Sequence, residues 1–446
     1  MNSLWQKLLK PVDNTGLVLW RIMLGFLLVA EAWGAIFTGW LAESFVEPQF
    51  RFTFIGFEFL QVLSGDMMYA YNIILGIFGL MIMLGWHYKM GVAGYFLMWA
   101  GIYFGQKSHY NNHYYLLLLL VGLMFFIPAN AYASLDAKRN PKIKRLHAPF
   151  WAYFIFMLQF GIVYFYATLA KLYPDWLQAK PVSLWLTSKS DYWLIGSLLE
   201  KDWVHWLFAY GGIFYDATII PFLIFRKTRK LALVLSIVFH LTNSAVFHIG
   251  IFPFLAVSAV LIFWDPEQLR KIFFRSKPQF IPLVRTLKFL AKDKTLAAAF
   301  IIYFVIQIYL PLRHWLYEGN VHWTEEGHRL SWQMMTRSKW GSGYFVVEDL
   351  KTGQRFNEQP DQRLLPHQAS SMTKRPDMIW QYSQYLQHVY REKGHDSVAV
   401  YARTLISLNG RLKQPLVDPG FDLTTVKSWP RFQSKSWVTP LKGDEE

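Results

Sequence analysis

The chain has 446 residues, of which 53% are hydrophobic, 18% aromatic and only 17% charged. Soluble proteins usually carry roughly 25% charged residues, so this composition argues against an ordinary soluble fold. The formal net charge of +15 comes from short basic runs between apolar blocks. Such runs are typical of membrane topology signals and argue against nucleic-acid binding. The absence of cysteine excludes disulfides, thiolate metal sites and cysteine nucleophiles.

Apolar blocks fill the first 312 residues and are expected to span a lipid bilayer, since a span needs about 20 mainly apolar residues. Nine blocks lie at residues 17–37, 67–86, 90–106, 114–133, 150–170, 206–225, 231–248, 250–264 and 296–312. The first lacks a clear cleavage site, so no cleavable signal peptide is expected. The eighth is short and is expected to form a tight or re-entrant hairpin with the seventh. The sequence predicts an all-α membrane bundle of about nine transmembrane helices over residues 1–312.

The basic loops indicate how the bundle is oriented. Lys and Arg gather in the loops at 136–145, 226–230 and 270–294, which share one side if nine blocks span. Because basic loops stay on the cytoplasmic side, we expect a cytoplasmic N-terminus. The C-terminal part is then extracytoplasmic, in the periplasm for a bacterium or a lumen for a eukaryote. The protein is expected to be integral to the inner or plasma membrane if bacterial.

Residues 313–446 read as an extramembrane α+β domain. Strands are predicted at Arg329–Arg337, Tyr344–Asp349 and Val398–Ser407 from their residue pattern. Gly353 is expected to supply a positive φ in a turn. A helix is predicted at Pro376–Tyr390, with proline near its start and apolar residues on one face.

Polar groups at the outer ends of three blocks are candidates for chemistry. Asn112 and His113 begin the fourth block, where they can cap the helix, orient a substrate or act in acid–base catalysis. Lys171 ends the fifth block. It is consistent either with a snorkelling lysine paired with Asp175 or with a partly buried amine of lowered pKa, which is a usable base. These alternatives stay open at this stage.

The seventh block carries a polar stripe at helical spacing that is expected to face the bundle or a cavity rather than lipid. Its residues are His240, Asn243, Ser244, Phe247 and His248. No carboxylate or cysteine accompanies the histidines at ligand spacing, so no metal is expected. Three further charged residues lie within apolar blocks. Arg21 is expected to make a structural pair or a headgroup contact, Glu31 shares its block, and Asp216 is equally consistent with a structural or a functional role. Groups from three blocks that converge on one leaflet favour a site there.

These motifs carry a resemblance that covers nearly the whole chain. They are Asn112-His113-Tyr114-Tyr115-Leu116, Ala170-Lys171-Leu172 with Asp175-Trp176, and His240-Leu241-Thr242-Asn243-Ser244 with Ile249-Gly250-Ile251-Phe252. The tail adds Ser331-Trp332-Gln333-Met334-Met335 and Ser436-Trp437-Val438-Thr439-Pro440-Leu441. In their order and spacing the sequence resembles the vitamin K-dependent γ-glutamyl carboxylase family. That family includes bacterial membrane proteins described as horizontally transferred transmembrane domain proteins.

The resemblance implies an enzyme that carboxylates protein glutamate residues while it epoxidises a quinol. It implies that Lys171 deprotonates reduced vitamin K, either menaquinol or phylloquinol. Reaction with O2 then gives an alkoxide-epoxide that is basic enough to remove a γ-proton from glutamate, and the carbanion captures CO2. His113, oriented by Asn112, is implied to assist at the glutamate or carbanion. The expected quinone-binding residues are His240, Asn243, His248, Tyr166 and Trp176, and the expected partners are a glutamate-containing protein or peptide and the bilayer.

Two departures from the family pattern leave other functions open. The chain is much shorter than the animal carboxylases, and Arg337 stands where they carry histidine. One alternative is a quinol-epoxidising oxygenase that does not carboxylate glutamate. Another is a non-catalytic membrane or lipid-binding protein of the same fold.

Overall fold

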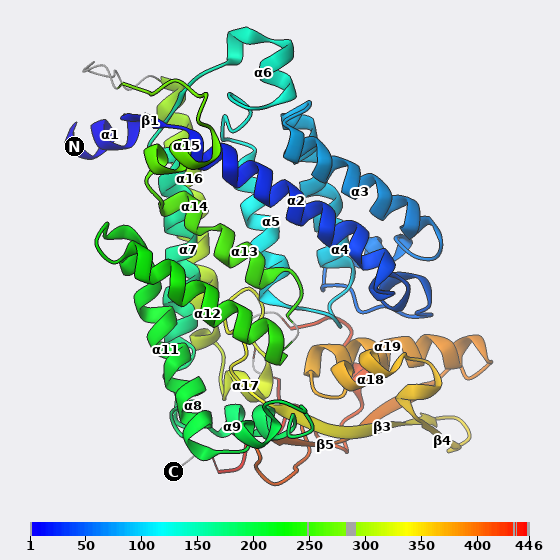
Figure 1. The fold of residues 1–446 in the computed structure, drawn as a ribbon. Helices are drawn as coiled ribbons and strands as arrows, with labels where there is room; N and C mark the ends of the chain where they lie inside the picture. The colour runs from blue at the N-terminus through cyan, green and yellow to red at the C-terminus, as the bar shows by residue number, and fades with distance from the viewer. Residues whose placement is uncertain (1, 248, 282–290, 431–432, 434, 444–446) are drawn as a thin grey trace.

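Long apolar helices form the N-terminal part of the molecule, and a small sheet with two helices lies at one end of them (Figure 1). The computed structural model describes residues 2–247, 249–281, 291–430, 433 and 435–443. The helices of the N-terminal part are α1 (Asn2–Leu9), α2 (Thr15–Phe37), the π-helix η1 (Ala42–Val46), α3 (Met67–Leu84), α4 (Tyr88–Gly105), α5 (Asn112–Met124), α6 (Leu135–Arg139), α7 (Trp151–Leu169), α8 (Pro174–Leu177), α9 (Lys180–Thr187), α10 (Gly196–Leu199), α11 (Asp202–Ile224), α12 (Arg229–Phe247), α13 (Phe252–Ser258), α14 (Val260–Phe263), α15 (Pro266–Phe273) and α16 (Ala291–Leu312).

Within the described residues, six helices are long and apolar enough to cross a membrane, namely α2, α3, α7, α11, α12 and α16. The other three predicted spans also fold as helices. However, α4 is less apolar, α5 has only 13 residues, and the block at 250–264 is divided into α13 and α14. The structure therefore supports a mostly helical membrane part with six candidate spans, while nine crossings stay a prediction.

Helices α2 and α3 approach each other closely because glycines lie between them. A Cβ atom on Gly25 would lie 2.5 Å from the backbone of Met83, and one on Gly76 would overlap the Trp33 ring. Small residues allow such close packing of helices in membranes. The contact fixes the direction of α2, whose C-terminal half carries Glu31 and leads into η1.

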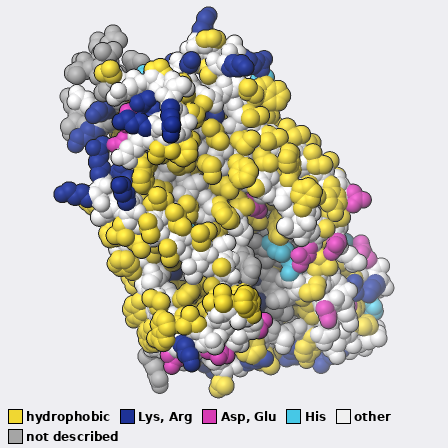
Figure 2. Space-filling view, in the orientation of Figure 1, with side chains coloured by type: hydrophobic (Ala, Val, Ile, Leu, Met, Phe, Trp, Pro, Cys, Tyr) yellow, Lys and Arg dark blue, Asp and Glu magenta, His cyan; other side chains and the backbone are white. Residues whose placement is uncertain are grey.

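The basic loops gather at one end of the bundle. The Lys277 amine donates to Asp13 and Asn14 at 2.7 Å each, just before α2. Lys277 and Lys144, from two different loops, both lie over the ring of Tyr132. Figure 2 shows Lys and Arg side chains concentrated at the end that carries α6 and α15, beyond a broad apolar surface. Of the basic residues in the third loop, Arg285 and Lys288 lie outside the described residues.

Arg21 makes structural contacts at this end of the bundle. Its side chain is buried and donates to the carbonyls of Ala129 and Ala133, at 3.3 and 2.7 Å. Of the two expected roles, the buried structural contact is the one observed, although its partners are backbone carbonyls rather than an acidic side chain.

The C-terminal part forms a three-stranded antiparallel sheet, in the order β4 (Arg355–Glu358), β3 (Lys339–Asp349) and β5 (Val398–Leu408). Its other elements are α17 (Val321–Thr324), α18 (Pro366–Met372) and α19 (Pro376–Glu392). The predicted strands at 344–349 and 398–407 and the predicted helix at 376–390 are confirmed, and Gly353 has φ +71°. A further two-stranded sheet, β1 (Pro11–Asp13) with β2 (His147–Pro149), lies at the basic end of the bundle.

The predicted strand at Arg329–Arg337 is wrong. The segment folds as a series of turns in which Leu330, Trp332 and Met335 have φ of +61°, +59° and +49°. Left-handed conformations are costly for such residues and persist only where the surroundings impose them. Here Trp332 is fully buried and stacks on Tyr115 of α5 at 5.0 Å. The apolar residues of this segment alternate as they would in a strand, but they instead anchor a loop against the membrane helices.

The C-terminal part is docked on loops of the membrane part. Phe52 belongs to the core of the C-terminal part and is fully buried. Its neighbour Phe50 stacks on Tyr385 of α19 at 4.5 Å, and the Gln381 amide donates to the Thr53 carbonyl at 3.1 Å. In Figure 1, α18 and α19 lie between the sheet and the membrane helices. The two parts thus share one apolar core along this junction.

We expect Gly25→Ala to destabilise the protein, because the added methyl group overlaps the backbone of α3. Overpacking of this kind costs about 1–3 kcal/mol. Gly34→Ala on the same helix is the matched control, since a Cβ there meets no atom within 4 Å. The melting temperature of the detergent-solubilised protein should fall for the first variant and not for the second. Equal melting temperatures would contradict the close packing of α2 on α3.

Candidate functional site

An apolar cavity of about 410 Å³ lies among the ends of α7, α11 and α12 and is bounded by Met334 and Met335. Most of its lining is aromatic or aliphatic. Its charged and polar lining groups are His113, Tyr164, Lys171, Tyr215, Asp216, His240, Thr242 and Asn243. Three more lining residues, Leu207, Phe214 and Val238, belong to the exposed apolar surface of the candidate spans α11 and α12. One wall of the cavity is therefore formed by residues that also belong to the exposed apolar surface of the bundle.

Lys171 projects its amine into this apolar environment and is only 7% exposed. Its Nζ donates to Asp216 Oδ2 at 2.7 Å and to the Ala167 carbonyl at 3.2 Å, and it lies 5.5 Å from the centre of the Trp176 ring. The snorkelling interpretation, with an ion pair to Asp175, is wrong. Asp175 instead faces the C-terminal part, where it accepts from Asn409 at 2.8 Å and pairs with Arg411.

His240 forms the polar wall of the apolar cavity together with two tyrosines. Its Nε2 lies 3.0 Å from the Tyr215 hydroxyl and 3.3 Å from that of Tyr164. Its Nδ1 is buried, and no described residue gives it a hydrogen-bond partner. Buried polar atoms without partners are rare in native proteins. This nitrogen is therefore a candidate hydrogen-bonding group for a molecule in the cavity.

The other predicted quinone-binding residues divide into two groups. Asn243 and Trp176 line the apolar cavity, and the Trp176 Nε1 donates to the Ala209 carbonyl at 3.1 Å. Tyr166 does not line it, because its hydroxyl donates to the Ile308 carbonyl of α16 at 2.9 Å. His248 lies outside the described residues.

A second, polar cavity of about 620 Å³ lies between the start of α5 and the loop at 325–337. Asn112 and His113 line it, and Glu31 of α2 faces it from the opposite wall. The helix cap of α5 comes from Asn111, whose side chain accepts from the Tyr114 amide. Asn112 is therefore available for another role, but its oxygen accepts from the Tyr110 hydroxyl at 2.8 Å rather than contacting His113.

Cationic groups of the C-terminal part dominate the far wall of the polar cavity. Arg329, Arg337 and Arg375 line it together with Glu325 and His328. Glu325 is buried and is paired with Arg337, and also with Lys339 at 3.4 Å.

The pKa values of these groups follow from their burial and proximity. Burial alone would raise the pKa of Glu325, but the adjacent Arg337 and Lys339 hold that pKa well below its usual range. Burial lowers the pKa of Lys339 to about 7, and it lowers that of His328 well below its usual range. Glu325 is thus a carboxylate and His328 a neutral imidazole at pH 7, and the guanidinium groups keep the wall positive.

The two cavities share one wall. His113, Ile249, Phe252, Met334 and Met335 line both of them. The imidazole of His113 stacks on the Phe252 ring at 3.8 Å and 13°, and His240 meets the edge of the same ring at 5.6 Å. An apolar chamber with a buried lysine and a polar chamber with a cationic wall therefore meet at the side chains that line both.

Comparison with known families accounts for both parts of this arrangement. A family model described as HTTM domain matches residues 9–267, which is more than half of the chain. A second, described as vitamin K-dependent gamma-carboxylase, lumenal domain, matches residues 292–444. The chain belongs to the vitamin K-dependent gamma-glutamyl carboxylase family. No solved structure matches the chain.

The motifs shared with the carboxylase family identified Lys171, His113 and His240, and the structure brings all three to one cavity. Two features were missed. The contact of Lys171 with Asp216 joins residues 45 apart in the sequence, although a carboxylate within an apolar block was a usable signal. The cationic wall was overlooked because its residues lie in the soluble tail, where charged residues are ordinary.

Glu325→Gln should destabilise the protein strongly, because it leaves Arg337 and Lys339 buried without their shared counter-ion. Breaking a buried ion pair costs about 3–5 kcal/mol. Since the pKa of Glu325 is depressed, its stabilising contribution is complete above pH 4.5, the ordinary value, and is lost only as the pH falls further. The difference in melting temperature between the two proteins, measured from pH 7 to the lowest pH at which they stay folded, tests both points.

Glu348→Gln is the control for this measurement. Glu348 pairs with the exposed Arg355 on the sheet, and such a surface pair contributes only about 0–1 kcal/mol. Equal losses of melting temperature for the two variants would show that the Glu325 pair is not structurally important.

Proposed function

We propose that this member of the carboxylase family catalyses γ-carboxylation of glutamate residues in a protein or peptide, coupled to epoxidation of a reduced vitamin K quinol by O2, with CO2 as co-substrate. The observation that carries the proposal is the shared wall of the two cavities. One chamber has the properties required by an apolar quinol, and the other has those required by an anionic peptide. His113 and Phe252 separate them, so groups held on the two sides would lie close together.

The apolar cavity fits a naphthoquinol. Its volume of about 410 Å³ lies in the range usual for small-molecule sites, and its walls are mainly aromatic. The unpartnered Nδ1 of His240 and the amide of Asn243 supply polar contacts for ring oxygens. The apolar wall of α11 and α12 suits the isoprenoid tail of menaquinol or phylloquinol. When bound, the quinol supplies, with O2, a base stronger than any side chain.

Lys171 is proposed to accept the proton of the quinol hydroxyl. A lysine held as a full ion pair cannot accept a proton, so its own proton must first move. Asp216, at 2.7 Å, is placed to take that proton and leave a neutral amine. Transfer within the pair removes both charges from a dry chamber, which lowers the electrostatic cost of forming the base. Asp216 therefore acts on the quinol through Lys171, as a positioning residue.

The polar cavity is proposed to receive the glutamate side chain. Arginine guanidinium groups bind carboxylates with two parallel hydrogen bonds. Of the three that line this chamber, Arg329 and Arg337 are already paired with Asp377 and Glu325, whereas Arg375 donates to the Ser371 carbonyl at 2.9 Å. Arg375 is therefore the one proposed to bind the glutamate. The loop at 325–337 of the C-terminal part contributes to its lining, which suits a peptide that approaches from the extramembrane side. His113, on the shared wall, is the group proposed to assist at the glutamate, with Asn112 held in place through Tyr110.

The same proposal gives the protein its orientation and domain division. The basic loops gather at the end of the bundle away from the C-terminal part, which supports a cytoplasmic N-terminus and an extracytoplasmic C-terminal domain. We place the domains at residues 1–312 and 313–446, in the inner or plasma membrane if the source is bacterial. The peptide then approaches from outside the membrane, and the quinol from within it.

Lys171→Ala should abolish epoxide formation, because no other amine among the lining residues of the apolar cavity can replace it. The assay incubates purified protein with reduced menaquinone or phylloquinone, labelled bicarbonate and a glutamyl peptide. Asp216→Asn should lower epoxide formation by about 10²-fold, since the amide keeps a hydrogen bond but accepts no proton. Lys180→Ala is the control, because Lys180 is half-exposed and outside the cavity.

The products formed by the unsubstituted protein distinguish the candidate activities. Epoxide together with fixed label supports the proposal, whereas absence of both with efficient quinol delivery refutes it. Epoxide without fixed label identifies an oxygenase that does not carboxylate glutamate. Unchanged products in Lys171→Ala would remove Lys171 from the reaction.

His113→Ala should reduce label fixed in the peptide more than it reduces epoxide. Its imidazole lies on the shared wall, while Lys171 and Asp216 are unchanged. His388→Ala, at an exposed position on α19, is the control. The ratio of fixed label to epoxide is the measured quantity. If both products fall in the same proportion, the placement of His113 on the glutamate side is wrong.

A further inference from the structure

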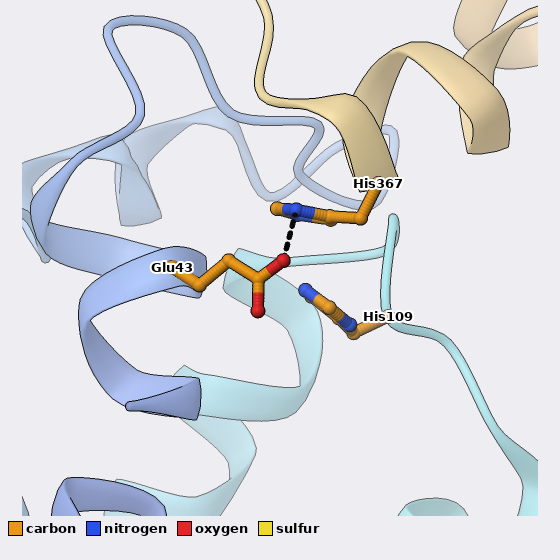
Figure 3. Close-up of side chains that lie close together, drawn as sticks. All are labelled: Glu43, His109 and His367. Carbon is orange, nitrogen blue, oxygen red and sulfur yellow. Dashed lines mark ion pairs between the residues drawn. The ribbon is translucent and has the colours of Figure 1, made fainter. Parts of the chain in front are cut away.

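Three side chains from distant segments meet where the C-terminal part docks on the membrane part (Figure 3). Glu43 comes from η1, His109 from the loop between α4 and α5, and His367 from α18. One ligand atom of each lies within 4.8 Å of the other two. Among the described residues, this is the one group of three or more His, Asp or Glu side chains that meets so closely.

The imidazole nitrogens of this group lack hydrogen-bond partners. His109 Nε2 and both ring nitrogens of His367 are buried, and no described residue forms a hydrogen bond with them. Glu43 Oε1 lies 2.9 Å from His367 Nδ1 in an ion-pair contact (Figure 3). Buried polar atoms in native proteins are nearly always paired, so the Nε2 atoms of His109 and His367, which have no partner among the described residues, indicate a missing partner beside the carboxylate.

The two imidazoles pack against each other and against an aromatic ring. Their rings stack at 4.1 Å and 28°, and the Trp40 ring packs on His109 at 5.6 Å. An imidazole nitrogen is a strong ligand for first-row divalent metals.

We propose that Glu43, His109 and His367 bind a divalent transition-metal ion, Zn²⁺ or a close analogue. Two imidazoles and one carboxylate form a known zinc-binding set that leaves a position for water. Glu43 is 49% exposed, which gives the ion a path from solvent. Figure 2 shows histidine side chains at the bottom of a hollow flanked by acidic residues on the face drawn there.

The ion would tie together three segments that shape the polar cavity. His367 belongs to the C-terminal part, and His109 lies four residues before His113. Trp40, which contacts His109, also packs on Tyr114 at 5.8 Å and lines the polar cavity. Metal binding therefore clamps the C-terminal part onto the loop that leads into Asn112 and His113. This role stands whether or not the chain carboxylates glutamate.

The test uses the full-length protein, purified in detergent without a histidine tag and stripped with EDTA. Added Zn²⁺ should bind with one equivalent per chain by metal analysis after dialysis, and Co²⁺ should give the visible absorption of a site with nitrogen and oxygen ligands. His109→Ala, His367→Ala and Glu43→Gln should each weaken binding by more than about 100-fold. His388→Ala should bind like the unsubstituted protein.

A second readout separates loss of metal from loss of folding. Zn²⁺ should raise the melting temperature of the unsubstituted protein and of His388→Ala, and it should not raise that of Glu43→Gln, whose half-exposed side chain is not needed for folding. Two results would overturn the proposal. One is a folded, unsubstituted protein that binds neither metal, which would leave a metal-free imidazole–carboxylate contact only. The other is binding that survives all three substitutions.

Discussion

The buried contact of Lys107 with Asp377 fixes the position of the C-terminal part relative to the membrane part. Lys107 follows α4 and is only 1% exposed, and Asp377 begins α19. The same carboxylate accepts from Arg329 at 2.7 Å. Burial alone would raise the pKa of Asp377, but Arg329 and Lys107 hold that pKa well below its usual range. Since an unpaired charge in such a place is strongly destabilising, the membrane loop, α19 and the turns after Arg329 can pack in only one way.

This fixed position of the C-terminal part on the membrane part determines which side chains line the cavities. The segment anchored by Arg329 continues through Trp332 and Met334 to Arg337, and its side chains are shared between the apolar and the polar chamber. The stacking of Trp332 on Tyr115 stabilises the left-handed backbone conformation of Leu330, Trp332 and Met335. A loop of the soluble part thus completes a site whose other walls are membrane helices. Neither part alone encloses either chamber.

The sequence was informative where a single local property decides the structure. Hydropathy located the helices that follow the apolar blocks, and periodicity located α19, β3 and β5. The prediction failed at Arg329–Arg337, because an alternating apolar pattern is compatible both with a strand and with a buried loop. For Lys171 the sequence left two alternatives open and gave no sign of Asp216 as the partner, because the two residues are 45 positions apart. Long-range contacts such as Glu43 with His367 leave no local pattern to read.

The proposed reaction needs two different environments, and the two separate chambers supply one each. A strong base survives only where water is excluded, whereas a glutamate side chain brings charge and hydration with it. One open chamber could not satisfy both conditions. With the aromatic layer of His113 and Phe252 between them, the lysine side keeps its low polarity while the carboxylate is compensated by Arg375. Proton transfer then requires the reacting atoms to meet at this layer. The thickness and rigidity of the layer, more than the strength of either binding site, set the geometry of the chemical step.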